Sequence, residues 1–210
     1  MYITRLKLDT RKRATMRALQ NLNMFHGAVE RAVDATEERK LWRIDNVAGT
    51  SYIMILSATK PNMKYMEEQF GDGTPAVTKV YDKYIDQIEN GSQWRFRLVA
   101  NPTIKIKVPN KNRSVARAHI TPEYQKAWLM NRAEKYGFRL NDDSFDVKRA
   151  TWYNFEKNAA DADAKHITML SVTFEGLLNV TDADKFRELL VMGIGREKAY
   201  GHGMITVAAV

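Results

Sequence analysis

The 210-residue sequence contains no cysteine. Disulfide bonds, zinc sites built from thiolates and catalytic thiols are therefore excluded. Long apolar runs are also missing, and none approaches the ~20 residues that a membrane-spanning helix needs. The opening residues alternate polar and apolar side chains and lack the apolar core of a secretory signal. We therefore expect a cytoplasmic protein with no membrane partner.

Histidine is scarce, and the four histidines lie far apart in the sequence. No His-Glu-x-x-His motif occurs, and the paired aspartates fall in expected turns and helix caps. These residues show no metal-ligating spacing, so we predict neither a metal site nor any other cofactor.

Basic residues outnumber acidic ones. The counts of 33 Lys and Arg against 25 Asp and Glu give a formal net charge of +8. This excess favours a polyanionic partner, either nucleic acid or an acidic surface. The basic residues gather in two segments, 5–17 and 95–117, and in an expected hairpin that carries Lys148, Arg149, Lys157 and Lys165. Each cluster taken alone also fits a solvated strand edge or loop.

Hydrophobic periodicity predicts two mixed α+β halves. In the first half we expect strands at 2–9, 41–47 and 51–59, a basic linker at 11–17, and helices around 25–33 and at 78–89. Residues 94–108 are expected to form either one long strand or a pair of strands broken at Asn101-Pro102. In the second half we expect helices at 121–136 and 181–192 and strands at 144–156, 166–180 and 204–210. The first half follows the β-α-β-β-α-β order of a ferredoxin-like unit, and the second reads as a less regular copy. The predicted fold is therefore α+β, with tandem ferredoxin-like (RRM-like) domains at 1–110 and 118–210.

A glycine-rich segment precedes the final strand. Gly193, Gly195, Gly201 and Gly203 flank a short stretch that contains Arg196 and Lys198. Glycine lets backbone amides approach an anion closely, and nearby cations can neutralise a phosphate. The simpler interpretation is a helix C-cap followed by a tight turn. A nucleotide-binding P-loop is excluded because no Gly-Lys-Ser/Thr follows.

His26 is the histidine with the most suggestive position. It follows Phe25 of the apolar stripe, and we expect it in the first turn of its helix, with Asn21 or Asn23 as the N-cap. A helix N-terminus attracts phosphate and disfavours the imidazolium, so a neutral imidazole there could act as a general base. Arg31, five residues further on, could serve the same region. A purely structural role for His26 is the alternative.

Five separated segments together resemble one family. Residues 1–8, 25–32, 96–102, 172–182 and 193–203 are similar, in the same order, to segments of CasE, the CRISPR RNA endoribonuclease of type I-E systems in the RAMP superfamily. The resemblance implies two ferredoxin-like domains that bind the stem-loop of a CRISPR repeat transcript. It implies one metal-independent cut at the 3′ side of the stem, in which a 2′-hydroxyl attacks the phosphate and leaves 5′-hydroxyl and 2′,3′-cyclic phosphate ends. It also implies that the product stays bound and that the protein joins other Cascade subunits.

The resemblance assigns roles to particular residues. His26 is implied as the proton-transfer residue, acting as base, acid or orienting group, and Arg31 as a cation that stabilises the phosphate. Asn23 stands where some relatives have tyrosine, and His202 stands where a small or sulfur-containing residue is usual. The RNA-binding residues that we predict are Asn23, Arg95, Arg97, Lys105, Lys107, Lys111, Arg113, Lys148, Arg149, Lys157, Lys165, Gly195, Arg196, Lys198 and His202.

Three other function classes remain open at the level of sequence. A non-catalytic RAMP subunit would hold RNA without cutting it. An unrelated RRM-like module lacks support because no Lys/Arg-Gly-Phe/Tyr-Gly/Ala-Phe-Val segment occurs. A metabolic enzyme could use the glycine-rich segment for a small phosphorylated ligand, although the net charge speaks against it.

Overall fold

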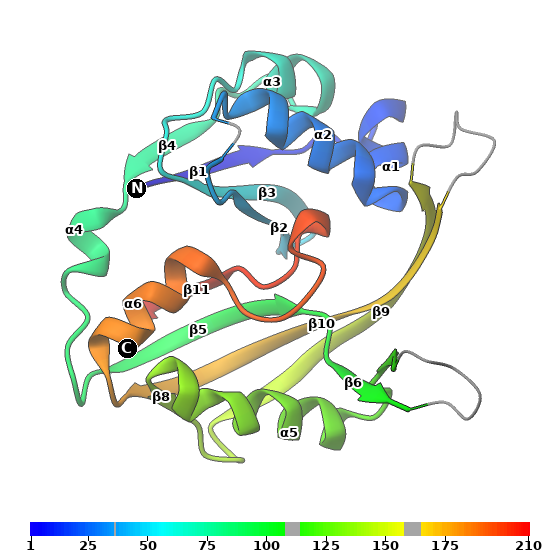
Figure 1. Ribbon diagram of the computed structural model, residues 1–210. Coiled ribbons are helices and arrows are strands. Elements are labelled where there is room, and N and C mark those ends of the chain that lie inside the picture. The colour runs from blue at the N-terminus through cyan, green and yellow to red at the C-terminus, as the bar shows by residue number, and fades with distance from the viewer. Residues whose placement is uncertain (36, 108–113, 158–164) are drawn as a thin grey trace.

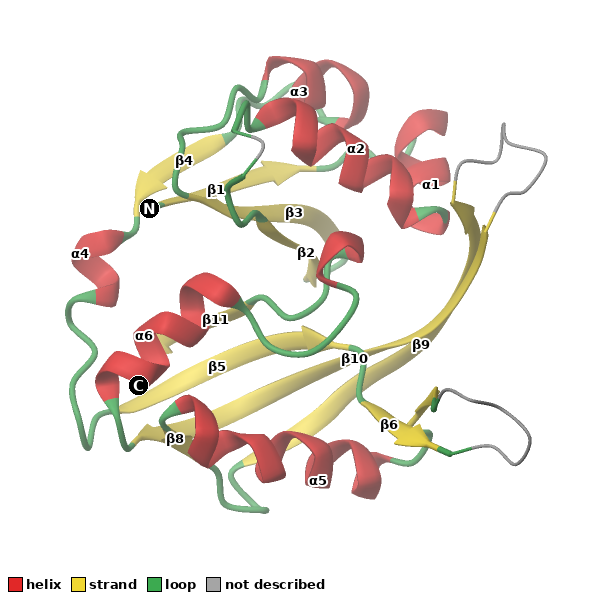
Figure 2. Cartoon of the chain, in the orientation of Figure 1, coloured by secondary structure: helices red, strands yellow, loops and turns green. Residues whose placement is uncertain are grey.

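The computed structural model describes residues 1–35, 37–107, 114–157 and 165–210 and consists of two antiparallel sheets with helices packed on them (Figures 1 and 2). Two predicted RNA-binding residues, Lys111 and Arg113, lie outside these ranges.

The first sheet is built by the amino-terminal part of the chain. Its elements are β1 (Tyr2–Lys7), α1 (Arg13–Gln20), α2 (Leu22–Ala32), β2 (Leu41–Val47), β3 (Thr50–Ser57), α3 (Lys64–Phe70) and β4 (Val77–Val80). The strand order is β2-β3-β1-β4, and all pairs are antiparallel. This is the ferredoxin-like arrangement that the sequence predicts.

The second sheet repeats this plan with additions. Its elements are α4 (Asp82–Ile85), β5 (Gln93–Ala100), β6 (Thr103–Ile106), β7 (Val115–Ala118), α5 (Pro122–Ala133), η1 (Glu134–Tyr136), β8 (Phe138–Arg139), β9 (Phe145–Lys157), β10 (Lys165–Val180), α6 (Ala183–Met192), η2 (Lys198–Tyr200) and β11 (Ile205–Ala209). The strand order is β11-β5-β10-β8, β9 also pairs with β10, and β6 and β7 form a separate hairpin. The fold is therefore a tandem of ferredoxin-like units.

Three local predictions in the first half are wrong. Residues 94–108 do not supply the last strand of the first ferredoxin-like unit, because β5 pairs with β10 and β11 of the second sheet. The strand that does close it is β4, only four residues long and largely exposed, which overlaps the start of the segment expected as a helix at 78–89; only the four residues of α4 are α-helical there. The expected linker at 11–17 is mostly helix α1. The chain thus changes sheets between residues 80 and 93, whereas the division into domains at 1–110 and 118–210 stays a prediction.

The helix boundaries in the second half follow the expected chemistry. Asp182 caps α6 by accepting the backbone N–H of Lys185, and Gly193 ends the helix with φ +68°. Pro122 opens α5, and Gly137 stops the following turn with φ +72°. These positions favour glycine because a positive φ is strained for residues with a Cβ.

A buried arginine joins the two sheets. Arg43 of β2 is 2% exposed and forms a double ion pair with Asp45 at 2.7 and 2.8 Å. Its remaining N–H groups donate to the backbone oxygens of Arg97 and Met204 and to Thr206 Oγ1. A buried charge is stable only when it is paired and hydrogen-bonded, and here both sheets supply the partners.

Candidate functional site

His26 lies on the open side of α2. Asn21 caps this helix by accepting the backbone N–H of Asn23, so His26 is the fifth helical residue. Its neighbour Phe25 is fully buried, whereas the His26 side chain is 32% exposed. The predicted place in the first turn is therefore wrong, and the unpaired amides of that turn do not act on His26, because their effect fades within it. Asn23 precedes His26 by three residues and shares its helix face.

Glu30 and Lys40 form a charged pair behind His26. Glu30 Oε1 lies 3.8 Å from His26 Nδ1, and Glu30 Oε2 accepts from Lys40 Nζ at 2.5 Å. The Lys40 side chain is 4% exposed and that of Glu30 is 46% exposed. The buried Lys40 thus binds one oxygen of the Glu30 carboxylate, and the other oxygen faces the His26 ring. The four-residue spacing of His26 and Glu30 on a helix was a signal available in the sequence, whereas Lys40 was not.

The glycine-rich segment packs against the same helix face. The Tyr200 ring in η2 lies 6.3 Å from the His26 ring at 73°, and it also meets Phe155 of β9 edge-on at 5.2 Å. Burial, with a smaller effect of Glu197, raises the pKa of Tyr200. Burial and the nearby Arg39 lower the pKa of Lys198, a half-buried cation of this turn. The predicted glycine-rich residue Lys198 and the predicted catalytic residue His26 are therefore on adjoining elements.

One glycine makes this close approach possible. Gly201 has φ +78°, and a Cβ at this position would lie 2.7 Å from the Trp42 ring. No side chain fits there without moving the turn that carries Tyr200. The requirement for glycine here comes from packing, in addition to the backbone conformation.

Arg31 points to a different neighbour. Five residues rotate a helix by about 140°, and the Arg31 guanidinium lies 4.0 Å above the Tyr65 ring of α3. The described contacts of the exposed Arg31 side chain do not include His26. The structure thus keeps the two predicted catalytic residues on one helix without bringing their side chains together.

A family comparison assigns the chain. A family model described as "CRISPR associated protein" matches residues 1–209. The chain belongs to this CRISPR-associated family.

Individual relatives agree with this assignment. The chain is 29% identical over 223 residues to the CRISPR-associated endoribonuclease Cse3 of Thermus thermophilus, covering 99% of this chain and 100% of that protein. It is 28% identical over 144 residues to the CRISPR system Cascade subunit CasE of Escherichia coli K12, covering 64% and 68% respectively. A structure of CRISPR endoribonuclease Cse3 bound to a 19 nt RNA superposes with a TM-score of 0.82 at 28% identity, covering 99% of this chain and 100% of that chain. The expected resemblance to CasE is confirmed.

Part of the predicted RNA-binding set of this CRISPR-associated protein lies around α2. Asn21 Nδ2 donates to the backbone oxygen of Glu156. This hydrogen bond holds the end of β9 beside the start of α2, and the exposed Lys157 is the next residue of β9. Figure 1 shows the free ends of β9 and β10 at the upper right of the molecule, close to α1, and β6 below them at the lower right. Five further predicted residues are spread over this region and the glycine-rich segment: Lys165 opens β10, Lys105 and Lys107 belong to β6 or follow it, and Gly195 and Arg196 precede η2.

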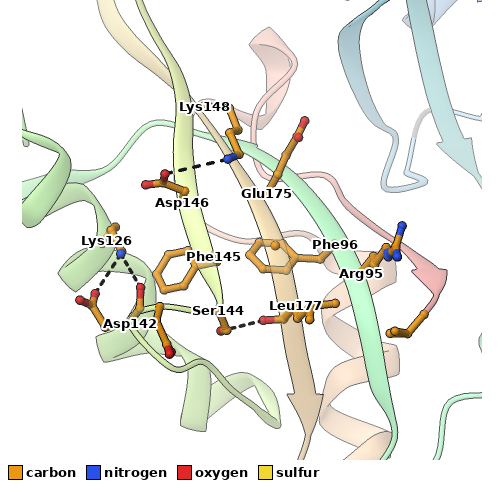
Figure 3. Close-up of a pocket in the computed structure, with 13 residues that line it drawn as sticks. Arg95, Phe96, Lys126, Asp142, Ser144, Phe145, Asp146, Lys148, Glu175 and Leu177 are labelled. Carbon is orange, nitrogen blue, oxygen red and sulfur yellow. Dashed lines mark hydrogen bonds and ion pairs between the residues drawn. The ribbon is translucent and has the colours of Figure 1, made fainter.

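Other predicted residues lie on the second sheet, and two of them, Arg97 and Lys148, are paired with carboxylates. Arg97 contacts both Asp45 and Glu175. Arg95 lines a cavity with a volume of about 640 Å³. In the same cavity Lys148 Nζ lies 3.9 Å from Asp146 Oδ2, and Figure 3 shows the two side chains facing each other. Arg149 donates from Nε to Thr151 Oγ1. The described contacts do not bring these residues to His26, and the carboxylates around them make a phosphate less favoured here.

His202 is a correction. The side chain was expected beside RNA, but it is 1% exposed, and neither ring nitrogen has a hydrogen-bond partner among the described residues. Burial lowers the pKa of His202 to about 4, and the backbone at Tyr200 and Glu197 opposes this shift without forming a bond of good geometry. An uncharged, enclosed imidazole cannot contact RNA in this conformation. Local sequence carries no sign of this burial.

Two features are missing from the described part of the chain. Among its residues, no three His, Asp or Glu side chains come together as metal ligands would. None of the described helices has the length and apolar character required to cross a membrane.

Proposed function

We propose that this CRISPR-associated protein is a metal-independent endoribonuclease that cleaves CRISPR repeat stem-loop RNA to mature crRNA. The observation that carries the proposal is the partly exposed His26 imidazole, which faces Glu30 and the glycine-rich segment, on a fold similar to RNA-bound Cse3. The name of the Cse3 relative, an endoribonuclease, supports the reaction class.

In the proposed reaction the RNA supplies its own nucleophile. The 2′-hydroxyl oxygen before the scissile bond forms a bond to phosphorus, the bond to the 5′-oxygen breaks, and the ends become a 2′,3′-cyclic phosphate and a 5′-hydroxyl. One proton leaves the 2′-hydroxyl and one reaches the departing 5′-oxygen. In this proposal His26 moves one of these protons, and its identity as base or acid stays open.

Glu30 is the carboxylate that faces this imidazole. At 3.8 Å it is too far from Nδ1 for a good hydrogen bond, so its effect on the ring is electrostatic. The other ring nitrogen, Nε2, is left for the RNA. Arg31, Lys198 and Asn23 are the proposed phosphate-binding groups, and Arg31 has to leave the Tyr65 ring to reach a phosphate near His26.

We further propose that the cut RNA stays bound and that the protein then acts as a Cascade subunit in the cytoplasm. The excess of basic residues supports tight binding of the RNA product and its slow release. The similarity to the Cascade subunit CasE supports the assembly. A subunit that binds RNA without cutting it is the alternative function.

Cleavage of the repeat RNA encoded in the same genome tests the proposal. We expect wild-type protein to cut in EDTA, and we expect His26→Ala or a 2′-deoxy nucleotide before the scissile bond to slow cleavage about 100-fold or more. RNA affinity, measured separately, should change little. Tight binding without cleavage by the wild type would favour the non-catalytic alternative, and an active His26→Ala variant would remove His26 from the mechanism.

A further inference from the structure

A second cavity lies beside the glycine-rich segment. It has a volume of about 520 Å³, and its walls come from β6, the residues after β7, α5 and the glycine-rich segment. Gly195 packs so closely on α5 that a Cβ there would lie 3.2 Å from the Trp128 ring. We call this cavity the α5 pocket. Its lining belongs in part to the same segment that carries Tyr200 to His26.

The charge in the α5 pocket is of one sign. Lys105, Arg132 and Arg196 line it, and its described lining contains no aspartate or glutamate. In the cavity of Figure 3, by contrast, Lys148 and Lys126 are each paired with an aspartate. Three cations without a carboxylate form a site that attracts an anion.

Arg132 is the cation of the pocket whose surroundings best suit a bound anion. It is half-buried, its guanidinium lies 4.4 Å above the Trp128 ring, and Nη1 donates to the Trp128 backbone oxygen at 2.9 Å. Burial lowers the pKa of Arg132. A guanidinium that has lost part of its water and has donors left over is suited to a phosphate, which accepts from two of its N–H groups at once.

Two aromatic rings that lie against each other line the α5 pocket. His119 and Tyr124 are stacked with their centroids 6.0 Å apart and their planes at 23°. Tyr124 is 58% exposed. Burial and the charge of Arg132 lower the pKa of His119, which disfavours the charged form of this ring. Exposed aromatic faces beside phosphate-binding cations are the usual platform for an unpaired base.

We propose that the α5 pocket binds one unpaired nucleotide of the RNA, with its phosphate against Arg132 and Arg196 and its base stacked on Tyr124. This proposal rests on the proposed function, because an RNA strand offers both the anion and the aromatic face. Since Arg196 and Tyr200 belong to one short segment, a nucleotide held here fixes the position of the strand relative to His26. Neither Tyr124, His119 nor Arg132 was among the residues expected from the sequence.

The stacking half of the proposal is tested with the full-length protein and the genome's own repeat RNA. Tyr124→Ala should weaken binding about 5- to 100-fold, the effect of losing one base–aromatic stack, and Tyr124→Phe should bind like the wild type. A series of RNAs, each with one abasic nucleotide, should contain one member that wild type and Tyr124→Ala bind equally. If Tyr124→Ala binds every RNA as the wild type does, or is weakened equally for every abasic RNA, base stacking at Tyr124 is overturned.

The phosphate half is tested through salt. Arg132→Gln should reduce the slope of log affinity against log salt by about 0.7, the value for one phosphate contact on a single strand. Arg139→Gln removes the same charge from an exposed position on β8 and should leave the slope unchanged. An unchanged slope in Arg132→Gln overturns the phosphate assignment.

The two levels of the proposal fail in different ways. If the wild type neither prefers nor cuts the repeat RNA over an unrelated RNA, the proposed function is refuted and the α5 pocket proposal falls with it. If the wild type binds and cuts the repeat but all pocket variants behave like it, the pocket proposal alone is refuted.

Discussion

Replacing Glu30 with glutamine should slow RNA cleavage without preventing RNA binding. Two unit charges about 4 Å apart interact by about 4 kcal/mol near a protein surface and about 1 kcal/mol in water. Glu30 is 46% exposed to solvent, so the lower figure applies. In the case where His26 is the general base, its ring gains positive charge in the transition state, and losing about 1 kcal/mol of attraction between Glu30 and that charge corresponds to a cleavage rate about 5-fold lower.

Lys40→Met supplies the control for stability. Either substitution breaks the Glu30–Lys40 pair, and because Glu30 is half exposed we expect each to cost about 1–2 kcal/mol in the free energy of unfolding. Only Glu30→Gln removes the carboxylate beside His26, so Lys40→Met should cut within about 2-fold of the wild type. Glu37→Gln, at an exposed position, controls for the loss of one negative charge.

Single-turnover cleavage with enzyme in excess over labelled RNA measures the rate directly, and urea unfolding measures the stability. The reasoning is refuted if Glu30→Gln cuts at the wild-type rate. It is equally refuted if Lys40→Met loses as much rate as Glu30→Gln, since the effect would then follow stability instead of charge at His26.

Three further predictions concern the surroundings of the site. Gly201→Ala should lower the thermal midpoint and slow cleavage, because its Cβ would lie 2.7 Å from the Trp42 ring; Gly49→Ala, at the same φ of +78° in open space, isolates the effect of this clash. Burial lowers the pKa of His202 to about 4 in the folded protein, from 6.5 in the unfolded chain. As the pH falls, the unfolded chain therefore binds a proton at His202 before the folded protein does. The free energy of unfolding should be unaffected above pH 6.5 and should decline by up to about 3 kcal/mol as the pH falls towards 4. Urea unfolding at pH 7 and pH 5 should show a smaller decline in His202→Gln, and equal declines would contradict the assignment. Asp45→Asn should cost about 3 kcal/mol, because it leaves the Arg43 guanidinium buried without its paired carboxylate; an unchanged urea midpoint would argue against this pairing.

Local signals predicted much of the fold. The capping aspartate and terminal glycine of α6, and the proline and glycine around α5, act within a few residues, so the sequence displays them directly. The sheet to which β5 belongs depends on contacts with β10 and β11, which lie far along the chain. The short strand β4 was not predicted, because four largely exposed residues show little alternation of polar and apolar side chains.

The candidate site divides along the same line. His26 was found through neighbours in its own helix and through the family resemblance. Lys40 and Tyr200 reach it from other elements, and no local spacing announces them. His202 was misjudged because burial is a property of the folded chain, and the residues beside it are glycines that would suit an exposed turn equally well.

The Arg43 guanidinium has a consequence for the order in which the chain can fold during synthesis. All five of its N–H groups are used, and two of their acceptors, the Met204 oxygen and Thr206 Oγ1, lie at the beginning of β11. While residues beyond 200 are still inside the ribosome, β2 carries a charge whose binding site is incomplete. The amino-terminal sheet of the nascent chain therefore reaches its final stability only when the last strand has emerged, and until then Arg43 remains in water.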